Sequence, residues 1–199
     1  KPLKIGNKVV IKPSWEEYES EVDDLIIEMD PGMAFGTGTH ETTVMCVQQL
    51  EKYVKPDSVV FDIGCGSGIL SISAAKLGAC KVIGVDLDAV AISVSNRNVL
   101  HNHVEDIVSI SQGNLMDVIS ETADIIVANI IADTIIILAT DIKEYLKENG
   151  IFIASGIILH KKDEVRDALI LNGLEIIEIN NIGEWVVIIS KIKDETKNA

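Results

Sequence analysis

The sequence predicts an α/β fold, in which a doubly wound and mainly parallel sheet ends in an antiparallel hairpin. From Thr39 onward, segments with helix and strand patterns alternate along the chain, as they do when helices cover both faces of a parallel sheet. Apolar residues make up 47% of the chain and aromatic residues only 4%, an aliphatic bias that suits strands buried on both faces. The last two predicted strands are joined only by residues 180–183, a connection too short for a crossover helix.

Hydrophobic periodicity and turn residues place the individual elements. Strands are expected at residues 59–63, 81–85, 107–111, 124–128, 151–155, 174–179 and 185–191. Helices are expected at residues 39–53, 69–77, 89–100, 134–146 and 161–171. Gly78, Gly150 and Gly173 follow three of these helices, where glycine commonly ends a helix.

These elements divide the 199 residues into one domain with two extensions. Residues 1–36 are expected to form an irregular lead-in or linker, with short strands at residues 8–12 and 25–29. Residues 37–193 are expected to form the α/β domain, and residues 194–199 a tail.

The charge and the cysteines limit the partners and the setting. A formal net charge of −14 disfavours non-specific nucleic-acid binding and favours a basic protein partner, although the same charge also serves solubility alone. Cys46, Cys65 and Cys80 have no CxxC spacing, which fits a reduced, cytoplasmic setting and predicts no metal site. No membrane span is predicted, because polar residues interrupt the most apolar stretch, residues 125–139.

A glycine-rich turn at residues 60–68 carries the clearest chemical signal. The segment Val-Phe-Asp-Ile-Gly-Cys-Gly-Ser-Gly runs from a strand directly into a helix, so its glycines permit positive φ and let a ligand approach the main chain. The spacing of Gly64, Gly66 and Gly68 is G-x-G-x-G, unlike the G-x-G-x-x-G of dinucleotide folds. Asp62, two residues before the first glycine, suits a cationic ligand group such as an ammonium better than a pyrophosphate.

Asp86 is expected at the end of the next strand, 18 residues after Gly68. A carboxylate at this point can accept both hydroxyls of a ribose. Together, the turn, Asp62 and Asp86 indicate a site for a ligand with a ribose and a cationic group. The alternative is a tight βα turn followed by a solvated aspartate.

Asn129 follows the strand expected to be fourth in the sheet, and ligands bind beyond the carboxyl ends of such strands. Its side-chain oxygen, or a neighbouring carbonyl, could accept a hydrogen bond from an amine and aim the lone pair of that amine. The alternative is an asparagine that caps the following helix.

The segment from Asp30 to Thr43 contains three glycines, a proline and four threonines, and it runs into a helix. Such a donor-rich loop could close over a cofactor from the N-terminal side. His40 within it could act as a catalytic base or as a structural cap, and the structural role is favoured.

These segments resemble the PrmA family, the methyltransferases that modify protein eleven of the large ribosomal subunit. The resemblance extends over nearly the whole chain from about Trp15, and it is marked by residues 30–40, 62–70, 127–130, 155–157 and 184–185. The glycine–threonine loop is the most diagnostic mark, because generic methyltransferases lack it.

The resemblance implies a seven-stranded, Rossmann-like class I methyltransferase sheet, with S-adenosylmethionine as the cofactor. It also implies cofactor contacts at Thr43, Gly64, Asp86 and Asn129, with Asn129 as the catalytic residue near the methyl group. Further candidate cofactor contacts are Phe35, Thr37, Gly38, Asp62, Gly66, Gly68 and Asn114. The implied substrates are protein amines, both lysine side chains and an N-terminal α-amine, that are methylated repeatedly.

One departure from the family concerns the substrate. Family members usually carry a small N-terminal domain that docks the ribosomal protein, and this sequence has no room for it. We therefore expect full cofactor binding but weak methylation of the ribosomal protein by this chain alone. The rival interpretations are an N-methyltransferase of another protein or of a small amine, a non-catalytic cofactor-binding domain, and a nicotinamide oxidoreductase.

Methyl transfer from a sulfonium is an in-line displacement, so the enzyme mainly has to position a neutral amine and exclude water. A free lysine amine has a pKa of about 10.4, which an apolar surrounding and a nearby cation would lower. No strong general base is evident in the sequence, and Phe35 and Ile130 are candidate apolar walls.

Overall fold

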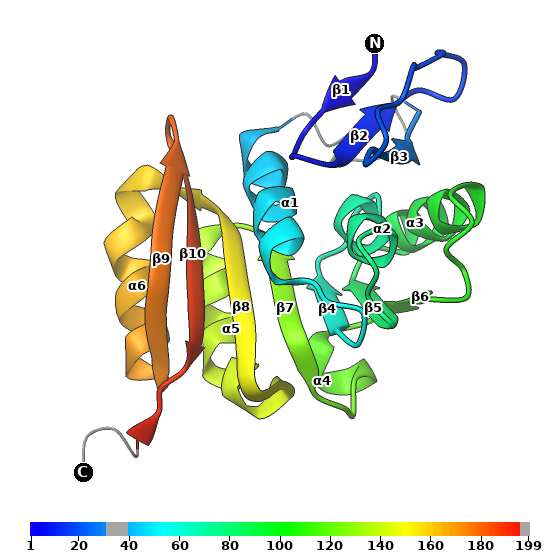
Figure 1. The fold of residues 1–199 in the computed structure, drawn as a ribbon. Helices are drawn as coiled ribbons and strands as arrows, with labels where there is room; N and C mark the ends of the chain where they lie inside the picture. Colours follow the sequence, from blue (N-terminus) through cyan, green and yellow to red (C-terminus); the bar gives the residue numbers. More distant parts are fainter. Residues whose placement is uncertain (31–39, 196–199) are drawn as a thin grey trace.

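The computed structural model describes residues 1–30 and 40–195, which form a seven-stranded and a three-stranded sheet with helices around them (Figure 1). The strands are β1 (Leu3–Lys4), β2 (Val9–Lys12), β3 (Leu25–Glu28), β4 (Val59–Ile63), β5 (Lys81–Asp86), β6 (Val108–Gln112), β7 (Ala123–Asn129), β8 (Leu146–Ile158), β9 (Leu174–Ile182) and β10 (Trp185–Ile192). The helices are α1 (Glu41–Tyr53), α2 (Ile69–Lys76), α3 (Ala89–His101), α4 (Leu115–Val118), α5 (Ala132–Tyr145) and α6 (Lys162–Leu171), with a short 3-10 helix η1 (Leu159–Lys161).

The strands of the large sheet lie in the order β6-β5-β4-β7-β8-β10-β9. Every neighbouring pair is parallel except those that β10 makes with β8 and β9. The chain moves to opposite sides of β4 for β5 and for β7, which creates a topological switch point between β4 and β7. The predicted doubly wound, seven-stranded sheet with a terminal antiparallel hairpin is therefore confirmed.

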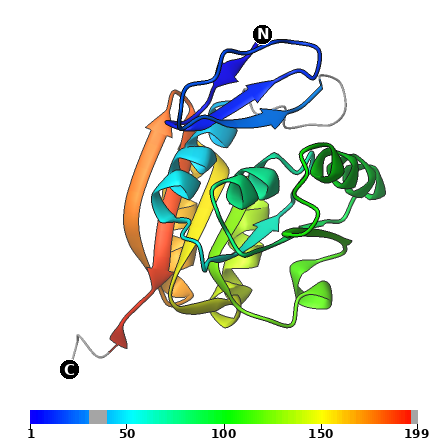
Figure 2. The same ribbon diagram turned by 45° about the vertical axis from the view of Figure 1, so that its right-hand side comes forward.

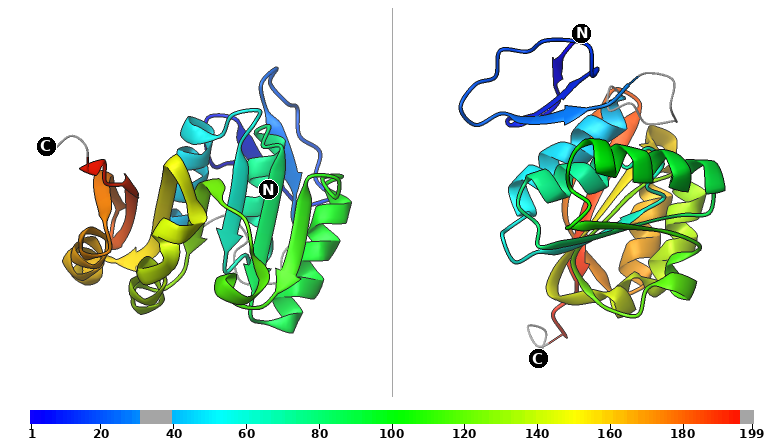
Figure 3. Two further views of the ribbon diagram at one scale, coloured as in Figure 1. Left: turned by 90° about the horizontal axis from the view of Figure 1, so that it is seen from below. Right: turned by 90° about the vertical axis from the view of Figure 1, so that its right-hand side faces the viewer.

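Helices cover both faces of this sheet, as the views in Figures 2 and 3 show. In β4, Val60 belongs to the buried cluster that contains Leu50 of α1 and Ile72 of α2. Phe61, the next residue, belongs to the cluster on the other face, with Ile135 of α5. The period of two along a strand thus divides the core into two layers. None of the helices in the described part of the chain is long and apolar enough to span a membrane.

The terminal hairpin places β10 between β8 and β9. Because β10 runs antiparallel, its first residue, Trp185, pairs with Ile158 at the carboxyl end of β8. Only Gly183 and Glu184 separate the two hairpin strands, and Gly183 has a φ of 56°. The connection predicted at residues 180–183 is therefore too long, because β9 continues up to the residue before the turn.

Strand β8 is also longer than predicted. It begins at Leu146, directly after α5, so the break expected near Gly150 lies inside the strand. Asn149 has a φ of 65°, and the pairing of β7 with β8 shifts register near this point. A bulge therefore allows β8 to continue through Gly150. Strand β1 and helix α4 are not predicted, because elements of two and four residues are too short to show a period.

The small sheet shares its core with the large domain. Strand β2 pairs antiparallel with β1 and parallel with β3. The buried side chains of Val9, Ile11 and Ile27 belong to the same cluster as those of α1 and α2. Figure 1 shows this sheet above the α1 and α2 side of the molecule.

Two polar contacts fasten the small sheet to helices. The carboxylate of Glu51 in α1 accepts the backbone N–H groups of residues 7–9 at 2.8, 3.2 and 3.3 Å. After α3, the amide of Asn102 accepts the N–H of Glu28 at 2.8 Å and donates to its carbonyl at 3.1 Å. These contacts satisfy backbone groups of the turn before β2 and of the edge strand β3 that the sheet itself leaves open.

Candidate functional site

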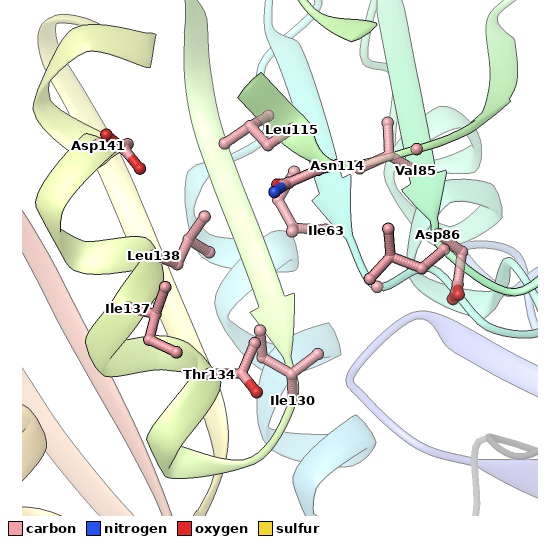
Figure 4. Close-up of a pocket in the computed structure, with 13 residues that line it drawn as sticks. Ile63, Val85, Asp86, Asn114, Leu115, Ile130, Thr134, Ile137, Leu138 and Asp141 are labelled. Carbon is pink, nitrogen blue, oxygen red and sulfur yellow. The ribbon is translucent and has the colours of Figure 1, made fainter. Parts of the chain in front are cut away.

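A cavity of about 370 Å³ lies at the carboxyl ends of β4, β5, β6 and β7, around the switch point (Figure 4). Its polar side chains are Asp86, Asn114, Thr134 and Asp141. The rest of the lining is apolar or glycine: Ile63, Gly64, Val85, Leu87, Gly113, Leu115, Ile130, Ile137 and Leu138. A largely apolar cavity with a few converging polar groups is typical of small-molecule sites at such sheet edges.

The three glycines of the turn after β4 have positive φ, as the sequence predicts: 72° at Gly64, 52° at Gly66 and 85° at Gly68. A Cβ at Gly64 would lie 2.6 Å from Cγ2 of Ile130, and a Cβ at Gly68 would lie 3.2 Å from Cβ of Ser95. The turn therefore needs glycine both for its backbone conformation and for its close approach to its neighbours.

Asp86 lies where the sequence places it, at the end of β5 and in the wall of the cavity. Its Oδ2 accepts the N–H of Gly66 at 2.9 Å, and its Oδ1 accepts the N–H of Asp88 at 3.0 Å. These bonds fix the carboxylate against the glycine turn. Each oxygen has a second lone pair, so the group can still accept the two hydroxyls of a ribose.

Asp62 has different surroundings. It is 1% exposed and does not line the cavity. Its Oδ2 accepts the N–H of Ser71 at 3.0 Å and the Ser71 hydroxyl at 2.7 Å, which attaches β4 to α2. Burial raises the pKa of the Asp62 carboxyl to about 6, because the bonds from Ser71 only partly replace water. A contact between Asp62 and a cationic ligand group stays a prediction.

Asn129 is the last residue of β7 and is partly buried. Its Nδ2 donates to Oγ1 of Thr43 at 3.3 Å, so two residues predicted to contact the cofactor are neighbours in space. Asn129 does not cap the next helix, because the N-cap of α5 is Ile131 and makes no side-chain cap. The alternative role as a helix cap is therefore wrong, and the catalytic role stays a prediction.

His40 is the N-cap of α1, and its Nδ1 accepts the backbone N–H of Thr42 at 3.3 Å. The same nitrogen lies 2.8 Å from the Thr42 hydroxyl, and the ring packs edge-on against Trp185 with centroids 5.0 Å apart. Nδ1 accepts an N–H bond only while it carries no proton, so the helix uses its lone pair. The structure thus supports the structural cap over the catalytic base.

The remaining wall of the cavity combines predicted and unexpected residues. Asn114 precedes α4 without a capping hydrogen bond, and its side chain lines the cavity (Figure 4). Ile130 lines the cavity too, as predicted for an apolar wall. Sequence reasoning missed Leu87 and Ile137, which are 74% and 71% exposed. A large apolar residue directly after the acidic strand end is a signal that could have found Leu87.

Three predicted cofactor contacts, Phe35, Thr37 and Gly38, lie outside the described residues. Over residues 1–30 and 40–195, no group of three or more histidine, cysteine or acidic side chains could hold a metal ion. Cys46 and Cys65 are buried free thiols, and Cys80 is an exposed one.

The sheet order and the place of the cavity define the class, a Rossmann-like methyltransferase fold. A methyltransferase structure from Pyrococcus furiosus matches with a TM-score of 0.68 at 17% identity, and the match covers 82% of this chain and 86% of that one. At this identity the likeness concerns the fold alone.

Closer matches define the family. The family model described as Ribosomal protein L11 methyltransferase (PrmA) matches residues 1–193, so the chain belongs to the PrmA family. A crystal structure of ribosomal protein L11 methylase from Lactobacillus delbrueckii subsp. bulgaricus has a TM-score of 0.91 at 31% identity, covering 97% of this chain and 99% of that one. The predicted family resemblance is confirmed.

Two curated relatives are more similar in sequence. The Ribosomal protein L11 methyltransferase of Alkaliphilus oremlandii is 65% identical over 193 residues, which are 97% of this chain and 62% of that protein. The protein of the same name from Clostridium perfringens (strain 13 / Type A) is 55% identical over 97% of this chain and 61% of its own length. The chain thus spans about 62% of the length of the curated relatives it matches.

Proposed function

We propose that this chain is the catalytic domain of an S-adenosylmethionine-dependent protein N-methyltransferase that acts on lysine and N-terminal amines of ribosomal protein L11. One observation carries the proposal: in a member of the PrmA family, the cavity at the switch point joins Gly64 of the glycine turn, Asp86 and Ile130, the residue directly after β7. Residues 37–193 are proposed as the catalytic domain.

The residues present fit the nucleoside part of this cofactor. Asp86 offers two fixed carboxylate oxygens with spare lone pairs to the ribose hydroxyls. Leu87, Leu115 and Ile137 supply apolar surface for the faces of an adenine ring, and Asn114 offers an amide at its edge.

The other proposed contacts extend from the nucleoside end of the cofactor toward its methyl group. Gly64, Gly66 and Gly68 leave the main chain open to the ligand, since a side chain at the first of them would meet Ile130. Thr43 and Asn129 are proposed at the methionine end, together with Asp62 through its hold on the turn.

S-adenosylmethionine supplies, when bound, an electrophilic methyl group on a sulfonium. The substrate nitrogen needs a free lone pair for this displacement, and its surplus proton leaves to water. Asn129 accepts an N–H of the substrate amine through Oδ1 and aims the lone pair. Ile130 contributes an apolar wall that excludes water and favours the neutral amine. His40 is assigned no part in the reaction, because its Nδ1 caps α1.

A basic ribosomal protein is also the partner that electrostatics favours. The formal net charge of −14 attracts a cationic protein, and this attraction weakens as salt screens it. The same charge repels phosphate backbones, so the proposal includes no direct nucleic-acid contact and no membrane contact. A ribosomal substrate and free thiols both support a cytoplasmic setting.

Two measurements test the function in sequence. Calorimetric titration is expected to show 1:1 binding of S-adenosylmethionine and of S-adenosylhomocysteine, and no binding of NAD. Mass spectrometry should then show methyl groups on recombinant ribosomal protein L11 but not on an unrelated basic protein or on free lysine. Binding of NAD alone would contradict the cofactor, and methylation of free lysine alone would contradict the protein substrate.

A further inference from the structure

We infer that Asn98 of α3 is a positioning residue, whose side-chain amide holds the glycine turn after β4 in the shape that binds the cofactor. The inference rests on the proposed function and deepens it, because it explains how a turn with three glycines keeps one conformation before the ligand arrives. Asn98 is not among the residues that line the cavity, so it acts through the turn.

The glycine turn has little stiffness of its own. Its three glycines have positive φ, and glycine adopts many backbone conformations with little difference in energy. Two hydrogen bonds shape the turn: the N–H of Gly68 donates to the carbonyl of Cys65 at 2.8 Å, and the N–H of Gly66 donates to Oδ2 of Asp86 at 2.9 Å. Ser67 lies between these two glycines, and its carbonyl accepts a bond from α3.

That bond comes from Asn98. Its Nδ2 donates to the carbonyl of Ser67 at 2.8 Å, although the two residues are 31 positions apart in the sequence. Asn98 is 8% exposed and Ser67 is 2% exposed, so water competes little for this bond. Ser95 of α3 lies beside the same segment, since a Cβ at Gly68 would be 3.2 Å from the Cβ of Ser95. Helix α3 therefore packs against the turn and also bonds it.

Through the turn, Asn98 also acts on Asp86. Oδ2 of Asp86 accepts the N–H of Gly66, the residue directly before Ser67. Oδ1 of Asp86 accepts the N–H of Asp88, which is the N-cap of α3. One helix thus restrains both oxygens of the carboxylate proposed to bind the ribose, one directly from its N-terminus and the other through the turn. A restraint present before binding raises affinity, because the ligand does not have to order the site.

A second amide at the end of α3 provides an internal comparison. Asn102 is 4% exposed, and its Oδ1 accepts the N–H of Glu28 at 2.8 Å. Its Nδ2 donates to the carbonyl of Glu28 at 3.1 Å and to the carbonyl of Asn98 at 2.8 Å. Both asparagines are buried and bonded, but Asn98 fastens the glycine turn and Asn102 fastens β3. A purely structural role predicts the same consequences at both positions, whereas a positioning role predicts a loss of cofactor affinity at Asn98 alone.

The first test replaces each amide with an apolar side chain of similar size. In Asn98→Leu the turn loses its bond from α3, and we expect the Kd of S-adenosylhomocysteine to rise by about 3- to 10-fold, the equivalent of one ordinary hydrogen bond. The KM for S-adenosylmethionine should rise in parallel, whereas kcat at saturating cofactor should stay within about twofold, because bound cofactor restores the turn. Asn102→Leu is the matched control, which should lose stability and keep the wild-type Kd.

Circular dichroism and urea unfolding show which variants are folded, so that affinity is compared only between folded chains. Should Asn98→Leu fail to fold, Asn98→Ala and Asn102→Ala give the same comparison with smaller side chains. Equal increases of Kd in the two substitutions would show a general loosening of α3. An unchanged Kd in the folded Asn98 variant, or a lower kcat with an unchanged KM, would show that the amide does not position the turn. Each of these results would overturn the inference.

Hydrogen exchange tests the same inference without any cofactor. The N–H groups of Gly66 and Gly68 are bonded at the turn, so relative to the amides of β4 both should exchange faster in Asn98→Leu and not in Asn102→Leu. If the wild-type chain binds neither S-adenosylmethionine nor S-adenosylhomocysteine, the proposed function fails, and the exchange rates still decide the positioning role. Unchanged exchange at both glycines in Asn98→Leu would end it.

Discussion

Asp24 of the small sheet and Asp62 of the large one are both acidic side chains that are 1% exposed, yet their surroundings are opposite. The carboxylate of Asp24 lies 2.9 Å from Nζ of Lys4 and accepts the hydroxyl of Tyr18 and the N–H of Glu21, both at 2.8 Å. The bond from Lys4, above all, lowers the pKa of Asp24 below its ordinary value.

Asp62 receives its two bonds from the uncharged hydroxyl and N–H of Ser71, so burial dominates and raises its pKa to about 6. The comparison shows that the buried carboxylate of the small sheet is paired with a cation, whereas the buried carboxylate of the large sheet is not. The small sheet neutralises its buried carboxylate and gains stability from it. Near the cavity, the charged carboxylate of Asp62 opposes folding at neutral pH. It lies beside the glycine turn that is proposed to bind a cationic cofactor.

The largest expected effect comes from adding a side chain within the glycine turn. This change should disrupt cofactor binding and leave the small sheet intact. Gly64→Val should lower the affinity for S-adenosylhomocysteine by roughly 100-fold or more, because its Cβ would start 2.6 Å from Ile130 and its φ is positive. Gly183→Val is the control, with a φ of 56° but no atom within 4 Å of a Cβ. Calorimetry measures the affinity, and circular dichroism checks folding. Wild-type affinity in folded Gly64→Val would remove the turn from the site.

Asp86→Ala should weaken cofactor binding by about 1.5–3 kcal/mol, or roughly 10- to 150-fold, the range for hydrogen bonds to a charged group. Asp88→Ala provides the comparison, because it removes only the cap of α3, in which Oδ1 accepts the N–H of Val90 at 2.9 Å. That variant should lose about 1 kcal/mol of stability and keep its affinity. Equal losses of affinity in the two variants would show that Asp86 acts through the loop and not on the ribose.

The two buried aspartates should respond to pH with opposite signs. The pKa of Asp62 rises on folding from 3.8 to about 6, so between these values the folded chain holds more protons than the unfolded chain, and stability falls as pH rises. The pKa of Asp24 falls on folding, so its contribution is present above the ordinary pKa and is lost as pH falls through the lowered one.

Asparagine at each position tests this difference. Asp62→Asn keeps an acceptor for Ser71 and should raise the free energy of unfolding at about pH 7.5 by about 1–3 kcal/mol, with little gain at about pH 4. Asp24→Asn should lower the free energy of unfolding at the higher pH and matter less in acid. Urea unfolding at several pH values measures both. A loss of stability in Asp62→Asn at neutral pH would contradict the comparison.

The smallest effect is expected at His40, the N-cap of α1. His40→Asn preserves an N-cap, so it should leave stability unchanged and kcat within about twofold of wild type. His40→Ala should lose about 1 kcal/mol of stability. Thermal unfolding and methylation assays measure the two effects. A large loss of kcat in a stable His40→Asn variant would restore the histidine as a proton acceptor.

Local signals made much of the large sheet predictable. Strand β4 has the predicted bounds, and the positive φ of Gly64, Gly66 and Gly68 follows from their place between a strand and a helix. The direction of Asp62 was also open to prediction. It shares a face of β4 with Val60, whose cluster includes α2, so the period of two points its carboxylate at that helix. Its charge alone suggested a ligand instead.

The small sheet and the cavity wall depend on contacts that no local pattern reveals. Strand β2 pairs with β3 across residues 13–24, and its neighbouring turn is held by Glu51, which is more than 40 positions away. The bond between Asn129 and Thr43 likewise joins distant segments. Periodicity within one segment carries no information on such pairs, because it describes which face is buried and not what covers it.

The place of β10 in the sheet has a consequence for how the chain is made. Strand β9 leaves the ribosome before β10, but within the sheet it pairs with β10 and not with β8. Until Ile192 has been synthesised, the apolar edge of β8 has no partner, and the nascent chain presents an open strand to its surroundings. Strand β10 also brings Trp185 against His40, at the first turn of the helix that carries Thr43. Synthesis of β10 therefore completes the sheet and brings Trp185 to the candidate site in one step.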